Sequence, residues 1–257
     1  MIADLARNLR GLGVVETISP QDRMFNPVNG LPRYLSVGRS GLRLILTAVV
    51  ARLGYPGGDS PISTILDFGS AYGRVTRFLR AAFPEAQLTV TDLNRDAVDW
   101  CVANLGVSAL EGDIPSNAFD LIFLGSVFTH VPPEVTAGLL TKLTSALRPN
   151  GILIFTTQGR YACADIETHP ERASYGLSRA QLDIILAGYK ALGYGFAEYS
   201  PGCGYGVSLI DRAWLDKQVG QQPDLTQILF QEKGYDHHQD GYTYLKSPIL
   251  AGGRSGL

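Results

Sequence analysis

Three acidic residues stand at or near the ends of short apolar runs, where carboxylates could bind a polar ligand. Asp67 lies in the run Ile65-Leu66-Asp67-Phe68, which continues into the small-residue loop Gly69-Ser70-Ala71-Tyr72-Gly73. Such a loop lets backbone approach a ligand closely, and the helix after it offers unpaired N–H groups. Asp92 ends the next run, where a carboxylate can accept both hydroxyl protons of a ribose. Asp113 ends the third and could accept from an adenine amino group.

A fourth apolar run ends in a small residue and an aromatic one, Ser126-Val127-Phe128, followed by His130. His130 could take a proton from a hydroxyl, or it could order the loop before Pro132 and Pro133. His238 is a second candidate base. His237 and His238 point apart as neighbours in a strand or turn, so the sequence predicts no metal site.

Short β-branched runs alternate with helical segments over residues 64–157, which predicts a parallel sheet wrapped by helices, a doubly wound α/β fold. Because the carboxyl ends of such strands share one edge, the four sites should converge on one crevice. The expected strands are 64–68, 87–92, 107–111, 119–124 and 151–157, and the expected helices are 74–82, 95–104 and 133–147.

The flanking segments complete the predicted organisation. A helix is expected over residues 40–53, because Leu42, Leu46, Val49 and Leu53 share one face after Ser40. After the fifth strand, residues 159–208 read as an insertion over the carboxyl edge, with one helix at 178–192 between irregular stretches. A helix at 212–219 and a closing antiparallel pair, 225–232 and 242–246, are expected at the end.

These residues resemble the class I S-adenosylmethionine-dependent methyltransferases, whose first motif is an acidic residue followed by three glycines at alternate positions. Here it reads Asp67, Gly69, Ala71, Gly73, with alanine at the middle glycine. The resemblance implies a seven-stranded, mostly parallel, Rossmann-like sheet with an antiparallel last strand, S-adenosylmethionine as cofactor and S-adenosylhomocysteine as product. It also implies these cofactor contacts: Tyr34, Ser36, Asp67, Gly69, Ser70, Ala71, Tyr72, Gly73, Asp92, Leu93, Asn94, Asp113, Ile114, Ser126, Val127 and Phe128.

Two further segments look like a narrower bacterial subgroup that acts on small molecules or glycans. Residues 33–38 resemble a loop that folds over the cofactor, and residues 234–240 resemble the ending of such domains. The chain thus divides into an N-terminal segment, 1–39, that carries this covering loop, and a methyltransferase domain, 40–257, whose part 159–208 covers the substrate. A dinucleotide dehydrogenase fits poorly, because Gly69 and Gly73 are four apart and do not form Gly-x-Gly-x-x-Gly.

The acceptor should lie under the insertion, with Gln158, Arg160 and Tyr205 as candidate substrate contacts. A hydroxyl on a small molecule or sugar is expected, since it would give His130 or His238 a proton to remove. N-methylation of a small molecule or peptide and a non-catalytic cofactor-binding subunit are the alternatives.

Composition sets the expected partners and location. A net charge of −2 argues against nucleic acid as a partner, and the apolar stretch 44–51 is too short to span a membrane. Three widely spaced cysteines and an N-terminus, MIADLARNLRGLG, without a signal-like apolar core predict a cytoplasmic protein. The sequence is compatible with an oligomer.

Overall fold

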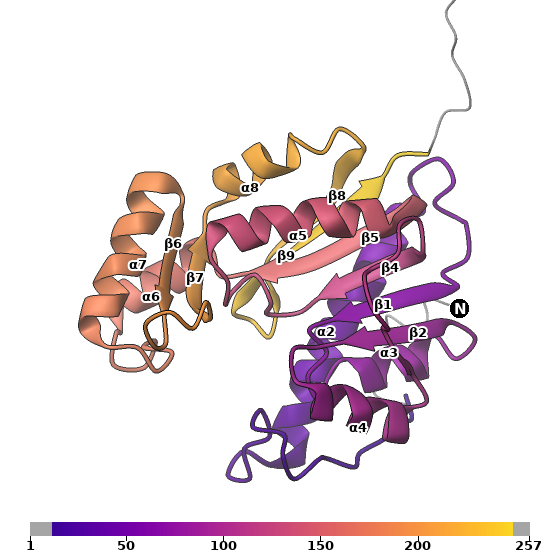
Figure 1. The fold of residues 1–257 in the computed structure, drawn as a ribbon, viewed down its shortest axis with the longest axis horizontal. Coiled ribbons are helices and arrows are strands. Elements are labelled where there is room, and N and C mark those ends of the chain that lie inside the picture. Colours follow the sequence, from indigo (N-terminus) through magenta and orange to yellow (C-terminus); the bar gives the residue numbers. More distant parts are fainter. Residues whose placement is uncertain (1–11, 249–257) are drawn as a thin grey trace, which may run out of the picture.

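One mixed sheet of seven strands forms the centre of the molecule (Figure 1). The computed structural model describes residues 12–248, so the expectation about the N-terminal signal falls largely outside the described residues. The strand order is β3-β2-β1-β4-β5-β9-β8. Neighbours from β3 to β5 pair in parallel, whereas β9 is antiparallel to both β5 and β8. The seven-stranded, mostly parallel sheet with an antiparallel last strand is therefore confirmed. Its strands are β1 (Thr64–Phe68), β2 (Gln87–Thr91), β3 (Ser108–Ala109), β4 (Phe119–Leu124), β5 (Leu147–Thr157), β8 (Leu225–Tyr235) and β9 (Gln239–Lys246).

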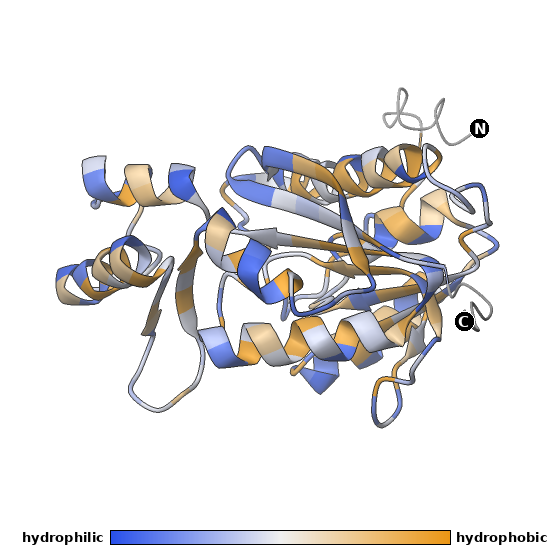
Figure 2. Cartoon of the chain, turned by 90° about the horizontal axis from the view of Figure 1, so that it is seen from above, coloured by the Kyte–Doolittle hydropathy of each residue, from blue (hydrophilic) through white to orange (hydrophobic). Residues whose placement is uncertain are grey.

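Helices cover both faces of this sheet, as Figure 2 shows from above. The helices α2 (Gly30–Arg52), α3 (Thr76–Ala82) and α4 (Arg95–Leu105) pack on one face, and α5 (Pro133–Ala146) and α8 (Arg212–Val219) on the other. Successive strand residues alternate between the two cores: Ile65 joins the first and Leu66 the second. Strands buried on both faces read as continuous apolar runs, which is why β1 and β4 were predictable.

The first described helix corrects two predictions. It begins at Gly30, not at Ser40, so residues 33–38 are helical and do not form a covering loop. A Cβ at Gly38 would lie 2.2 Å from the carbonyl oxygen of Arg74 and 2.6 Å from the ring of Phe78, so this glycine allows close packing of α2 on α3. By length and composition α2 could cross a membrane, yet 61% of its apolar window is buried inside the protein, as in a core helix.

Several strands differ from their predicted lengths, among them β8 and β9, which are each three residues longer than expected. The third has two residues, Ser108 and Ala109, where residues 107–111 were expected. It lies at the edge of the sheet, where short strands are common because they limit edge-to-edge pairing. The fifth begins at Leu147, four residues before the expected start, and passes through Asn150 with a φ of 63°. Its pairing with β4 shifts register there, so the predicted stop is an irregularity within the strand.

The insertion, defined here as residues 159–211, is more regular than expected. It contains α6 (Arg160–Thr168), α7 (Arg179–Leu192) and an antiparallel pair, β6 (Tyr194–Glu198) and β7 (Gly206–Ile210), around a core of its own. The predicted helix at 178–192 is present, with Ser178 as its N-cap. The stretches expected to be irregular contain α6, β6 and β7, while residues 169–177 and 199–205 have neither helix nor strand. A Cβ at Gly195 would lie 1.9 Å from the Ile185 carbonyl oxygen. That glycine sits inside a strand that packs tightly on α7.

Candidate cofactor and acceptor site

The loop after β1 has the left-handed backbone that a small-residue sequence permits. Gly69 and Gly73 have φ values of 76° and 74°, and Ala71, at the position of the middle glycine, has a φ of 44°. A Cβ on Gly69 would lie 2.4 Å from Val127, so the loop also requires glycine for close packing. A non-glycine residue with such a φ is strained and is held by its surroundings. At Ala71 the holding contact is a hydrogen bond from its N–H to Asp92 Oδ2, 2.8 Å long.

Asp92, directly after β2, ties two loops together. Its Oδ2 accepts the Ala71 N–H, and its Oδ1 accepts the N–H of Asn94 at 2.9 Å. Asn94 in turn caps α4, where its side chain accepts from the N–H of Ala97. Each carboxylate oxygen has a second lone pair, so Asp92 can still accept protons from a ligand. The carboxylate is therefore fixed in place at the carboxyl edge of the sheet.

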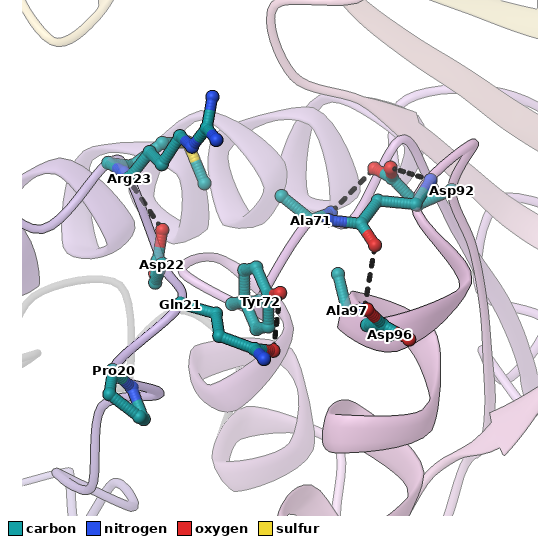
Figure 3. A pocket seen from close by; sticks show the side chains of 11 residues that line it. Pro20, Gln21, Asp22, Arg23, Ala71, Tyr72, Asp92, Asp96 and Ala97 are labelled. Atoms are coloured by element: carbon teal, nitrogen blue, oxygen red, sulfur yellow. Dashed lines mark hydrogen bonds between the residues drawn. The ribbon is translucent and has the colours of Figure 1, made fainter.

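A cavity of about 700 Å³ opens beside this carboxylate (Figure 3). One wall comes from the loops after β1 and β2, and the other from an N-terminal segment ahead of α2 that we call the strap, residues 12–29. Figure 3 shows Pro20 to Arg23 of the strap facing Ala71 and Asp92. The lining residues are Pro20, Gln21, Asp22, Arg23, Met24, Ala71, Tyr72, Asp92, Asn94, Asp96 and Ala97.

Buried polar contacts hold the strap in position. Tyr34 Oη donates to Asp22 Oδ2 at 2.6 Å, and Tyr72 Oη donates to Gln21 Oε1 at 3.1 Å. Arg77, 1% exposed, donates to the carbonyl oxygens of Val15 and Thr17. The strap thus takes the covering position that was predicted for residues 33–38. Sequence reasoning missed it because it has no regular structure, and the only local signal is the turn-forming Ser-Pro at residues 19–20.

Asp67, inside β1, is almost completely buried below the loop. It is 2% exposed, and Thr76 Oγ1 donates to its Oδ2 at 2.6 Å. Burial raises the pKa of Asp67 to about 7, against the opposing effect of the Thr76 hydrogen bond, and the charge of Asp92 raises it further. Near neutral pH this carboxyl is therefore poised to release a proton when a cation approaches.

The end of β4 forms a second strained turn. Ser126 has a φ of 62°, and its N–H donates to Thr156 Oγ1 at 2.8 Å. Gln239, from the start of β9, donates to Ser126 Oγ at 2.8 Å and accepts from Thr156 Oγ1 at 2.6 Å. Phe128, two residues further, is fully buried against Phe155, with ring centroids 5.0 Å apart. The polar network fixes the turn beside Gly69.

His130 is locked to the insertion. Its Nδ1 lies 2.7 Å from the carbonyl oxygen of Gly206. Because a carbonyl only accepts, Nδ1 carries the hydrogen, and a neutral ring then has its lone pair on Nε2. Burial lowers the pKa of His130, so the neutral form dominates at pH 7. The ring stacks on Tyr205 at 4.9 Å. This geometry fits both roles predicted for His130: the contacts with Gly206 and Tyr205 order the loop, and the Nε2 lone pair can accept a proton.

Tyr205 joins the insertion to the loop after β4, because its ring stacks on His130. Burial, the neighbouring Tyr199 and the charge of Asp92 all raise the pKa of Tyr205. His238, the other candidate base, pairs through Nε2 with the hydroxyl of Tyr175 at 2.9 Å, and burial lowers its pKa. Among the described residues, no hydrogen bond or ring contact joins His130 to His238, so they are separate groups.

The remaining predicted residues do not line the cavity beside Asp92. Leu93 is fully exposed, and Asp113 is an exposed partner of Lys142 at 3.3 Å. Ser36 is in α2, where its hydroxyl donates to the Arg33 carbonyl. Gln158 is buried, and Arg160 pairs with Glu232 at a second cavity. Ile114 packs against the α5 side of the core. Within residues 12–248, no three potential ligands form a metal site.

Residues 66–153 match the family model of a methyltransferase domain. The chain is 31% identical over 141 residues to a malonyl-[acyl-carrier protein] O-methyltransferase of Halalkalibacterium halodurans, covering 49% of this chain and 48% of that protein. The domain match and this relative support a class I S-adenosylmethionine-dependent methyltransferase. The chain is also 28% identical over 118 residues to a carboxy-S-adenosyl-L-methionine synthase of Aeromonas hydrophila subsp. hydrophila, covering 41% and 47% of the two chains. It therefore spans about half the length of these relatives.

A solved structure of similar fold contains the reaction product. The magnesium protoporphyrin IX methyltransferase of Synechocystis PCC 6803, with bound S-adenosylhomocysteine, has a TM-score of 0.54 at 14% identity. The match covers 88% of this chain and 90% of that chain. At this identity the likeness shows the fold alone. The methyltransferase-domain match supports S-adenosylmethionine as the cofactor.

Proposed function

We propose that this methyltransferase methylates a hydroxyl group of a small molecule or sugar. The observation that carries the proposal is His130, which is neutral, holds its proton on Nδ1 against Gly206 and presents a basic Nε2. A hydroxyl nucleophile loses a proton during methyl transfer, and a neutral imidazole is the usual group to receive it. An acceptor that carries no proton would leave the Nε2 lone pair of His130 without a role in the transfer.

The residues at the strand ends fit the cofactor by charge and reach. Asp92 would accept the two ribose hydroxyls, because both of its oxygens are fixed at the edge of β2. Asp67 would balance the positive charge of the methionine end, close to the loop of Gly69 to Gly73. Ser126 and Val127 would border the sulfur, and Asp113 with Ile114 the adenine. The strap would close the cavity over the ligand.

The protein's part in the reaction is to align and desolvate the acceptor. Bound S-adenosylmethionine supplies an electrophilic methyl group on a sulfonium sulfur. The insertion, through Tyr199 and Tyr205, would hold the acceptor oxygen in line with that carbon and exclude water. His130 Nε2 takes the hydroxyl proton as the new C–O bond forms, and the electron pair of the broken C–S bond remains on sulfur. The balance requires no metal and no further reactant.

Surface and cysteine chemistry support a cytoplasmic location as part of this proposal. Cys101, Cys163 and Cys203 are free thiols, and two of them are buried. Free thiols persist in a reducing compartment.

A transfer assay with labelled cofactor tests the proposal. Purified protein is incubated with S-adenosylmethionine carrying a labelled methyl group and with matched panels of sugars, phenols, alcohols and primary amines. We expect label in hydroxyl compounds, as an ether that survives mild base. Transfer to amines alone would contradict O-methylation, and tight cofactor binding without transfer to any panel would favour a non-catalytic subunit.

A further inference from the structure

A second cavity, of about 220 Å³, lies where the insertion joins the sheet. Gly159 and Arg160, where the chain enters the insertion, line one side, and Ile210 to Arg212, where it leaves, line another. The strands β8 and β9 supply the remaining wall, including Phe230 and Tyr242. No lining residue is shared with the larger cavity beside Asp92. The space holds about seven water molecules at roughly 30 Å³ each, which suits a ligand of few heavy atoms.

The innermost charged group of this cavity is Asp240. It is 3% exposed, and its Oδ1 accepts the N–H of Lys233 at 2.9 Å. Within the described residues its Oδ2 has no hydrogen-bond partner. Gly159 makes room for that oxygen, because a Cβ there would lie 2.1 Å from it. Burial raises the pKa of Asp240, against the lowering effect of the Lys233 hydrogen bond, and the charges of Glu232 and Arg160 act in opposite directions.

The other charged groups around Asp240 are engaged. Arg160 and Glu232 neutralise each other in a two-pronged ion pair. Asp211 caps α8 through the N–H of Ala213. Arg212 is exposed at the rim, with its guanidinium 4.8 Å from the centre of the Phe230 ring. It also donates to Gln227 Oε1 at 3.1 Å, and its Nε lies 3.9 Å from Asp216 Oδ2 in an exposed ion pair.

Among the lining residues, three carboxylates against two guanidinium groups leave one excess negative charge, on Asp240, with Arg212 as a cationic group at the opening. The cavity therefore offers a carboxylate inside and a guanidinium outside. Charges buried in this way are normally paired.

We propose that this cavity binds a small α-amino acid as a zwitterion, with its ammonium group on Asp240 and its carboxylate on Arg212. The inference is independent of the proposed methyl transfer, because it uses neither the larger cavity nor His130. A ligand there would touch both joints of the insertion. Binding would therefore restrict how the insertion moves relative to the sheet.

Calorimetry with L-alanine, methylammonium and acetate as probes tests this site. We expect L-alanine to bind and methylammonium to bind more weakly, with acetate giving no signal. Asp240→Asn keeps an acceptor for Lys233 but removes the charge, and should weaken L-alanine binding at least tenfold. Asp183→Asn, an exposed change in α7 beside Arg179, should bind as the wild type does. Absence of L-alanine binding, or equal binding by Asp240→Asn, would overturn the proposal.

The methionine portion of the cofactor is itself an α-amino acid, so the two cavities must be distinguished. Saturating S-adenosylhomocysteine should leave L-alanine binding unchanged, whereas competition would place L-alanine in the larger cavity and refute the assignment. Hydrogen exchange should slow at residues 159–160 and 210–212 when L-alanine is added. If Asp240→Asn fails to fold, Gly159→Ala provides the second variant, because its methyl group displaces Oδ2 and should reduce binding by a similar factor.

Discussion

The part of the molecule around the cofactor cavity and the insertion differ in how their glycines act. In the loop after β1, Gly69 and Gly73 adopt left-handed backbone, and a Cβ there would lie 2.4 Å from Val127 or 2.3 Å from Leu105. In the insertion, Gly195 and Gly206 lie in strands, where they let β6 approach α7 and β7 approach β6. Glycine therefore provides left-handed backbone as well as close packing in one region, and close packing alone in the other. The glycine content alone does not distinguish the two.

This difference predicts separable effects on catalysis and binding, and the largest should come from His130 at the contact between the two regions. His130→Ala removes the proposed base, so kcat for a hydroxyl acceptor should fall about 10²- to 10⁴-fold. Cofactor affinity should stay the same. His169→Ala, an exposed histidine in the insertion, is the matched control and should keep the wild-type rate. Steady-state rates for the two variants decide this point, and an unchanged kcat in His130→Ala would reduce His130 to a loop-ordering residue.

The second largest effect should come from the cofactor side. Asp92→Ala removes charge-assisted acceptors worth about 1.5–3 kcal/mol, so the Kd for S-adenosylhomocysteine should rise roughly 10- to 150-fold. The same change leaves the N–H of Ala71 without its acceptor, which should weaken cofactor binding further. Asp99→Asn, exposed on α4 and paired with Arg95, should bind normally. Calorimetric titration measures both, and wild-type affinity in Asp92→Ala would remove Asp92 from the ribose site.

A substitution in the insertion should weaken acceptor binding and leave cofactor binding unchanged. Tyr205→Ala removes a ring that stacks on His130, and losing such an aromatic contact costs about 0.5–1.5 kcal/mol. We expect the acceptor KM to rise roughly 2- to 12-fold while the cofactor Kd stays constant. Tyr55→Ala, in the turn after α2, should change neither value. A loss of cofactor affinity in Tyr205→Ala would show that the two regions are not functionally separate.

The smallest expected effect is the number of protons that Asp67 releases when the cofactor binds. Its folded pKa of about 7 lies above the ordinary value, so the protonated form contributes stability that is lost as pH rises towards 7. A bound cation reverses this preference and releases up to about half a proton at pH 7. Calorimetry in two buffers of different ionisation enthalpy measures the release, and Asp67→Asn should abolish it. Equal binding heats in both buffers for the wild type would show that no proton is released on cofactor binding. That result would contradict the placement of Asp67 beside the cofactor.

The sequence was sufficient for the cofactor region because the physical constraints there are local. Strands buried on both faces give apolar runs, and the loop between β1 and α3 needs small residues, so β1, β2 and β4 were predictable almost to the residue. Asp92 could be placed at a strand end for the same reason. Its role as the acceptor that fixes the N–H of Ala71 depends on a contact across 21 residues, which a linear pattern does not reveal.

The parts that the sequence did not predict depend on distant contacts. The strap has no periodicity, and its position rests on Tyr34, Tyr72 and Arg77 from later elements. Gly38 interrupts an apolar helix pattern only because α3 passes within contact distance. The sheet β6–β7 was likewise hidden by its glycines. In each case the deciding neighbour lies on another element, so a local interpretation favours a loop.

A crystal structure with S-adenosylhomocysteine tests the central claim most directly, because it locates the ligand relative to both regions. We predict ribose hydroxyls within about 3 Å of the Asp92 carboxylate, the amino group on the side of Asp67, and the sulfur directed towards His130. Product bound away from the carboxyl ends of β1 and β2, or a sulfur facing away from the insertion, would contradict the account.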